Sequence, residues 1–254
     1  MKIVIISAHP DDLETGIAGT AHLLKQAGHE VISVVGMLPT REISYADRGF
    51  GKQLAAEVRM EECRKASKKL SIKPIFLNFA EMGWELTNEM REYFKKLMSE
   101  IAPDVVFSHW SVDVNPDHRA LGALTLEAFM QKGMNTELFC YEVFSEVGRP
   151  QSLGFIPTHY VDIAGGPEDV KKKMVYCHNS QGIKGLWAGC MEMQRTRGVE
   201  HGIDHAEAFI RLTRCGKIHP ELRKIFRRTE HRLPHSTGVL ADPKKLGIAL
   251  DKVS

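Results

Sequence analysis

Short apolar runs rich in isoleucine and valine alternate with longer amphipathic segments up to Phe144, and this alternation limits the possible folds more than any other feature. The first run, residues 2–7, is continuous and β-branched, as in a strand buried on both faces. Strands that alternate with helices form βαβ units and a mostly parallel sheet. The expected strands are 2–7, 30–35, 74–77, 104–108 and 138–144, and the expected helices are 14–27, 55–70, 87–101 and 118–131.

The pattern weakens after Gly148. The elements expected there are a strand at 160–163, a helix at 167–179 and a short helix at 206–212. Beyond Cys215 the basic residues are scattered and Pro220 and Pro234 interrupt the chain, which is typical of irregular structure. We therefore expect a Rossmann-like α/β domain, with helices on both faces of its sheet, at 1–214. An irregular C-terminal extension, 215–254, would pack on this body or on a neighbouring subunit.

The composition excludes several classes of protein. Lysine and arginine total 34 and aspartate and glutamate 32, so the net charge is only +2 and gives no reason to expect a nucleic-acid partner. The five cysteines are scattered and include no CxxC pair, which favours a reducing compartment. No apolar run approaches the roughly 18 residues that a membrane span requires. We expect a cytoplasmic protein without a membrane span.

Side chains that can bind a metal follow two of the expected strands. His9 and Asp12 come directly after strand 2–7, and His118 comes shortly after strand 104–108. Because open parallel sheets bind ligands at the carboxyl edge of their strands, we expect these side chains to meet there. Two imidazoles and one carboxylate, with a position left for water, suit a catalytic zinc ion, whereas Ca²⁺ and Mg²⁺ prefer oxygen ligands. The pattern favours Zn²⁺ or another divalent transition metal.

Asp11 lies beside these residues and is not needed as a ligand. A second carboxylate close to a metal-bound water is what a hydrolase uses as a general base. An alternative stays open, because a Pro-Asp turn after a strand can simply place Asp12 as the cap of the next helix. Asp117 and His118, at a separate strand end, are not explained by such a turn.

Residues 8–14 (AHPDDLE) and 116–118 (PDH) resemble the two motifs of the PIG-L/LmbE-like family of zinc-dependent N-deacetylases. The first motif of that family is an alanine followed by His-Pro-Asp-Asp and an acid, and the second is His-x-Asp-His. The resemblance covers most of residues 1–210. It includes the segments 58–66 (VRMEECRKA), 171–181 and 205–209 (HAEAF).

The resemblance implies a role for each matching residue. His9, Asp12 and His118 would bind the metal and Asp11 would be the catalytic base. Asp117 matches the acid of the second motif. An arginine between the second strand and the next helix contacts the substrate or the oxyanion in this family; Arg48 is the best match and Arg41 its nearest competitor.

One position departs from the family pattern. Asn115 stands where the family has a histidine that stabilises the tetrahedral intermediate or protonates the leaving amine. An amide can donate a hydrogen bond to an oxyanion but cannot supply a proton at neutral pH. His109, His178 or Asp11 acting twice would then have to serve as the acid.

The resemblance implies an amide hydrolase that removes an acetyl or small acyl group from an N-acyl amino sugar or its conjugate, by attack of a zinc-bound water with Asp11 as general base. It also implies a homo-oligomer, a trimer or a hexamer. Two alternatives remain: a metal-binding but inactive family member, suggested by Asn115, and a Rossmann-like sugar- or nucleotide-binding protein. The chain has no GxGxxG after the first strand and no P-loop, which counts against a nucleotide.

Some other residues have two interpretations. Glu14 could orient His9 or simply be an acid in the first turn of a helix. His201 and His205 could share a helix face, but ordinary surface histidines are the commoner case. Trp110, next to the second motif, could stack on a sugar, although single tryptophans usually serve in packing.

Overall fold

The computed structural model describes residues 1–38, 54–81, 86–129, 136–144, 153–212 and 218–228. Arg48 and Arg41 lie outside these ranges, so the prediction for them stays a prediction. The strands are β1 (Lys2–Ser7), β2 (Glu30–Leu38), β3 (Ile75–Ala80), β4 (Val105–His109), β5 (Glu137–Tyr141), β6 (His159–Asp162), β7 (Ala206–Arg211) and β8 (Arg227–Arg228). The helices are α1 (Asp12–Gly16), α2 (Ala18–Gln26), α3 (Leu54–Lys68), α4 (Asn88–Ile101), α5 (Pro116–Phe129), α6 (Gly166–Val175) and α7 (Ile183–His201), with short 3₁₀ turns η3 (Asn179–Gln181) and η4 (Leu222–Lys224).

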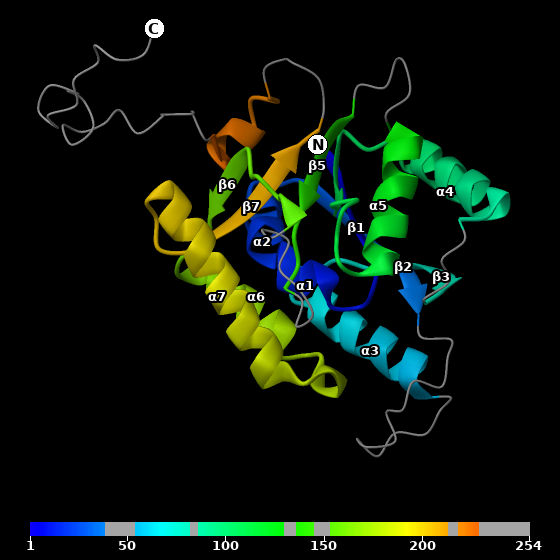
Figure 1. The fold of residues 1–254 in the computed structure, drawn as a ribbon, viewed down its shortest axis with the longest axis horizontal. Helices are drawn as coiled ribbons and strands as arrows, with labels where there is room; N and C mark the ends of the chain where they lie inside the picture. Colours follow the sequence, from blue (N-terminus) through cyan, green and yellow to red (C-terminus); the bar gives the residue numbers. More distant parts are fainter. Residues whose placement is uncertain (39–53, 82–85, 130–135, 145–152, 213–217, 229–254) are drawn as a thin grey trace, which may run out of the picture.

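The strands form one sheet in the order β3-β2-β1-β4-β5-β7-β6-β8. The first five strands in that order pair in parallel, and β7 pairs antiparallel with both β5 and β6. The predicted α/β fold with a mostly parallel sheet is confirmed. Figure 1 shows α4 and α5, in green, packed together, and α7, in yellow, alongside β6 and β7.

Helices cover both faces of the sheet, and successive residues of β1 show why. Ile3 and Ile5 pack in one apolar cluster with side chains from α1, α2 and α6. Val4 and Ile6 pack in a second cluster with side chains from α4 and α5. Since neighbouring residues of a strand point to opposite faces, a strand buried on both faces has to be apolar throughout.

The order of the strands reverses at β1, between β2 and β4. The chain passes from β1 to β2 on one side of β1, and later returns to place β4 on its other side. At such a reversal the connections after the two strands diverge to opposite faces of the sheet, which leaves room for a ligand at the carboxyl ends. The loops after β1 and β4 carry the predicted metal ligands.

One predicted helix is wrong and another is divided in two. The helix expected at 206–212 is strand β7 (Ala206–Arg211), in which Ala206 and Ala208 face one apolar cluster and Phe209 the other. Their alternation of faces and their pairing with β5 and β6 outweigh any local preference for helix. The single helix expected at 14–27 is interrupted at Ile17, which has φ −136° and separates α1 from α2. Helix α7 was not predicted at all.

The described part of the C-terminal extension packs on the body of the protein. Phe226 stacks on Phe139 of β5 with ring centroids 4.9 Å apart, and Leu222 is fully buried in the same cluster. Strand β8 pairs with β6 at the edge of the sheet. The boundary at residue 214 stays a prediction. Among the described helices, none is both long enough and apolar enough to cross a membrane.

Candidate metal centre

The loop after β1 folds back on itself, so that Asp12 contacts His9. Oδ2 of Asp12 accepts a hydrogen bond from the His9 backbone N–H at 2.6 Å. Asp11, not Asp12, is the N-cap residue of α1, and its side chain makes no capping bond. The interpretation of Asp12 as a simple helix cap therefore does not describe its contacts.

The second loop is organised by the start of α5. Asn115 Oδ1 accepts the backbone N–H of Asp117 at 2.8 Å, which is the usual bond of an N-cap asparagine, and Pro116 follows at the first helical position. Asp113 Oδ1 accepts the backbone N–H of Asn115 at 2.8 Å. These bonds place His118 in the first turn of α5. They also use the carbonyl oxygen of Asn115 and leave its NH₂ group as a donor.

The predicted ligands meet at the carboxyl ends of β1 and β4. His9, Asp12 and His118 each offer a ligand atom, and these atoms all lie within 4.8 Å of one another. His118 Nε2 is 3.4 Å from Asp12 Oδ1, and His9 Nδ1 is 3.6 Å from Asp12 Oδ2. The three residues are at most 7% exposed. Two imidazole nitrogens and one carboxylate at these separations fit a divalent transition metal.

The remaining nitrogen of each histidine faces a carboxylate. His9 Nε2 is 2.9 Å from Asp117 Oδ2, and His118 Nδ1 is 3.2 Å from Asp113 Oδ1. Metal-binding histidines usually donate their second N–H to a carboxylate or carbonyl group, which sets the orientation of the ring and raises its basicity. The arrangement leaves Nδ1 of His9 and Nε2 of His118 for the metal. Asp117 thus contacts the predicted ligand His9 and is not itself needed to bind the metal.

The predicted ligands carry strongly perturbed pKa values. Burial lowers the pKa of His9, but hydrogen bonds to Asp117 and Asp12 outweigh burial and raise this pKa to about 9. Burial also lowers the pKa of His118, but Asp12 and Asp113 outweigh burial and raise this pKa to about 10. The pKa of Asp12 is held well below its usual range by His118 despite burial. A cation can replace the protons that these carboxylates attract.

Asp11 lies beside the ligands in an unusual backbone conformation, with φ 141° and ψ −17°. Arg59 on α3 donates to Pro10 O at 3.2 Å and to Asp11 Oδ1 at 3.3 Å. Burial raises the pKa of Asp11, and Arg59 partly counteracts the effect. The Asp11 side chain keeps 15% of its surface exposed, so a substrate can reach it.

Two histidines considered as the acid are too deep to contact a substrate. His109 is 1% exposed, and its ring stacks on that of His118 at 4.1 Å. His109 Nε2 accepts the Ala8 backbone N–H at 2.8 Å, and burial lowers the pKa of His109. His178 has no exposed surface. The geometry leaves Asp11 as the candidate that can serve twice.

Sequence reasoning missed Glu81. Its Oε1 lies 3.6 Å from His9 Nε2 and 3.5 Å from Arg59 Nη1, and it forms a second possible metal-binding group with His9 and Asp117. Glu81 follows β3 directly, at the same edge of the sheet as the predicted ligands. Ending that strand at residue 77, three residues too early, hid this signal.

The remaining candidates are structural. The His201 ring stacks on Tyr160, whereas His205 lies beyond the end of α7 with its Nδ1 2.5 Å from Glu168 Oε2, so the two histidines do not share a helix face. Trp110 packs edge-on against Phe155. Glu14 lies in the first turn of α1, as one of its two interpretations predicted, and its Oε2 also lies 3.5 Å from His178 Nε2.

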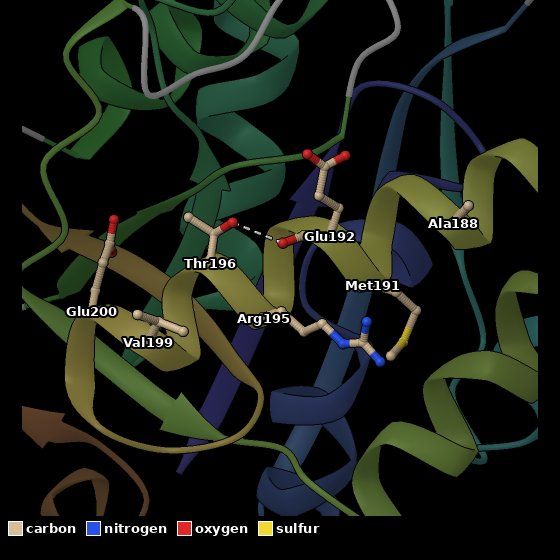
Figure 2. Close-up of a pocket in the computed structure, with 7 residues that line it drawn as sticks. All are labelled: Ala188, Met191, Glu192, Arg195, Thr196, Val199 and Glu200. Carbon is tan, nitrogen blue, oxygen red and sulfur yellow. Dashed lines mark hydrogen bonds between the residues drawn. The ribbon is translucent and has the colours of Figure 1, made fainter.

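A surface hollow along α7 is separate from this cluster. Figure 2 shows its lining side chains arranged along this one helix, among them Met191, Arg195 and Val199. Val199 is 80% exposed, and the Thr196 hydroxyl already donates to the Glu192 carbonyl at 2.9 Å. None of the lining residues belongs to the metal centre. The hollow therefore does not compete with the cluster as a candidate active site.

Known proteins resemble the chain over its sequence and its fold. The sequence profile of the PIG-L family, described as GlcNAc-PI de-N-acetylase, matches residues 4–129. The diacetylchitobiose deacetylase of Thermococcus kodakarensis is 28% identical over 210 residues, which are 79% of this chain and 78% of the relative.

Two solved structures share the fold. The N,N′-diacetylchitobiose deacetylase of Pyrococcus horikoshii superposes with a TM-score of 0.68 at 22% identity, over 83% of each chain. GalB, a 4-carboxy-2-hydroxymuconate hydratase of Pseudomonas putida, superposes with a TM-score of 0.71 at 18% identity, over 86% of this chain and 98% of its own. The fold therefore also occurs in a protein named as a hydratase, so the fold alone does not decide the reaction. The sequence profile thus identifies residues 4–129 as a domain of the PIG-L family.

Proposed function

We propose that the protein is a zinc-dependent amide hydrolase that removes an acetyl or small acyl group from an N-acyl amino sugar or its conjugate. The observation that carries this proposal is the convergence of His9, Asp12 and His118 with a partly exposed carboxylate, Asp11, beside them. The PIG-L domain supports it, as does a relative named for its action on diacetylchitobiose.

In this proposal His9, Asp12 and His118 hold the metal. When bound, Zn²⁺ supplies Lewis-acid chemistry: it lowers the pKa of a water and polarises a carbonyl oxygen. Asp117 orients the His9 ring and Asp113 that of His118.

Asp11 accepts a proton from the attacking water and, since His109 and His178 are buried, returns a proton to the departing amine. The NH₂ group of Asn115 is free of the capping bond and would donate to the developing oxyanion. Arg48 would do the same from outside the described residues.

The test combines metal analysis of the purified protein with acetate release from a panel that includes N,N′-diacetylchitobiose and N-acetylglucosamine. Asp11→Asn should keep its zinc and lose about 100-fold or more in kcat. Asp104→Asn, at the opposite end of β4, is the matched control and should keep the activity of the wild type. A wild-type rate in zinc-loaded Asp11→Asn contradicts the role of Asp11.

The two alternatives give different results in the same experiment. Stoichiometric metal without acetate release from any sugar indicates an inactive family member. Tight nucleotide binding without metal indicates a Rossmann-like binding protein. The homo-oligomer and the cytoplasmic location stay predictions, and light scattering of the purified protein tests the first.

A further inference from the structure

Arg59 on α3 contacts both the loop after β1 and the residue that follows β3, and the mechanism above gives it no task. Its Nη2 donates to Pro10 O at 3.2 Å and to Asp11 Oδ1 at 3.3 Å. Its Nη1 lies 3.5 Å from Glu81 Oε1. Arg59 is only 5% exposed, and a guanidinium group is rarely buried to this extent without partners. These contacts are the partners that allow the burial.

Helix α3 places Arg59 on its buried side. Arg59, Glu62, Cys63 and Ala66 are each at most 7% exposed, and their spacing is that of one helix face. Glu62, one turn after Arg59, accepts the Ser180 backbone N–H at 2.8 Å and the Ser180 hydroxyl at 2.7 Å. These two bonds fix α3 against the η3 turn. The side chain of Arg59 therefore extends from a helix that is itself anchored.

The two bonds of Nη2 hold the Asp11 carboxylate to its own loop. One acceptor is the carbonyl oxygen directly before the unusual backbone of Asp11, which has φ 141°, and the other belongs to the Asp11 side chain. Glu81 restrains Nη1, the other terminal nitrogen, and so limits rotation of the guanidinium plane. A lysine has only one nitrogen and cannot reproduce this planar fork.

We propose that Arg59 is a positioning residue for Asp11 and that Glu81 acts through Arg59. Because Arg59 holds Oδ1 of Asp11, Oδ2 is the oxygen that would accept the proton of the attacking water. The inference rests on the proposed function, since it takes Asp11 as the base. It differs from a purely structural role, which would lower stability alone, and from a contact with the substrate, which would raise KM.

Substitutions in the full-length, zinc-loaded protein separate these roles. Arg59→Ala should lower kcat about 10- to 100-fold, with KM and zinc content within about twofold of the wild type, because a base displaced by about 1 Å reacts slowly. Arg59→Lys keeps the charge without the fork and should still lose about tenfold. Arg64→Ala removes an exposed arginine of the same helix, paired with Glu61, and is the matched control that should keep its kcat.

Guanidinium ion tests the position of the missing group. At concentrations well below those that unfold the protein, it should raise the kcat of Arg59→Ala about fivefold or more, whereas methylammonium should not. Neither ion should change the kcat of Arg64→Ala. Glu81→Gln should lower kcat in the wild-type background and have no further effect in Arg59→Ala, because its path through Arg59 is then absent.

A crystal structure of Arg59→Ala tests the inference without activity. The Asp11 carboxylate should be displaced, and in crystals soaked with guanidinium it should return, with the ion between Pro10 O and Asp11 Oδ1. A carboxylate that stays in place without guanidinium overturns the proposal. So does an unchanged kcat in Arg59→Ala or, if that variant does not fold, in Arg59→Lys.

Other outcomes are equally decisive. A raised KM at unchanged kcat would make Arg59 a substrate contact, and additive losses from Arg59→Ala and Glu81→Gln would remove Glu81 from the proposal. No rescue by guanidinium in a folded, zinc-loaded Arg59→Ala also overturns it. A wild type that deacetylates no sugar contradicts the proposed function instead, while the crystal structures still report whether Arg59 positions Asp11.

Discussion

Glu207 on β7 joins three separate segments through one buried carboxylate. Its Oε1 accepts hydrogen bonds from Lys171 Nζ at 2.7 Å and from the Gly19 backbone N–H at 3.0 Å. Its Oε2 accepts a hydrogen bond from the Thr20 backbone N–H at 2.7 Å. Glu207 is 3% exposed and Lys171 is not exposed at all. The two N–H groups belong to the first turn of α2, where a negative charge is favourable. The carboxylate thus stabilises the restart of the helix after the break at Ile17.

We predict that Glu207→Ala lowers the free energy of unfolding by about 5 kcal/mol. Breaking a buried ion pair costs about 3–5 kcal/mol, because the remaining charge is left unpaired. Each backbone N–H that loses its acceptor adds about 1–3 kcal/mol, less where water enters the vacated space. Because natural domains are stable by only about 5–15 kcal/mol, the variant should lose most of its stability.

Urea unfolding followed by circular dichroism, at fixed metal content, measures the effect. Glu207→Gln/Lys171→Met removes both charges and keeps a carbonyl for the α2 amides, so it should recover at least half of the loss. Glu92→Ala, which removes an exposed partner of Lys95, is the control and should change stability by less than about 0.5 kcal/mol. A loss under about 2 kcal/mol in Glu207→Ala would refute the argument.

Two further predictions concern the metal centre. Asp117→Asn and Asp113→Asn should each weaken zinc binding about 10- to 100-fold in competition with a chelator, because they remove the carboxylates that orient His9 and His118; unchanged affinity in both would contradict that role. Since carboxylate partners outweigh burial and raise the pKa of His9 to about 9 and that of His118 to about 10, both histidines are protonated at neutral pH without metal. Zinc uptake should then release protons, and the affinity for zinc should rise with pH up to about 10, as calorimetry in buffers of different ionisation enthalpy can check.

The parallel half of the sheet was predictable because its signal is local. A strand buried on both faces is largely apolar, and the β-branched runs in β1, β2 and β4 show this directly. Strand β7, which includes Glu207, was mistaken for a helix because a short and mostly apolar segment suits either element. That glutamate is buried only because Lys171, 36 residues away in the sequence, lies opposite it. Long-range pairing of this kind cannot be recognised from the residues on either side of Glu207.

The convergence of the predicted metal ligands was predictable for a different reason. His9, Asp12 and His118 follow strands whose carboxyl ends meet, so the topology alone brings them together. The side-chain contacts around these residues were not predictable. Whether His118 faces Asp113, and whether Glu14 faces His178, depends on side-chain directions that chain spacing does not determine.

The backbone conformation at Asp11 lowers the stability of the folded protein. A residue with a Cβ at φ 141° is strained by about 1–3 kcal/mol. Asp11→Gly and Asp11→Ala both remove the carboxylate and its contact with Arg59, so the difference in their unfolding free energies reports the backbone alone. At an ordinary position inside a helix or strand glycine is about 0.5–1 kcal/mol less stable than alanine. Here we expect glycine to be the more stable by about 1 kcal/mol or more. If alanine is equally stable, the backbone at Asp11 is relaxed, and the position of the base depends on its side-chain contacts alone.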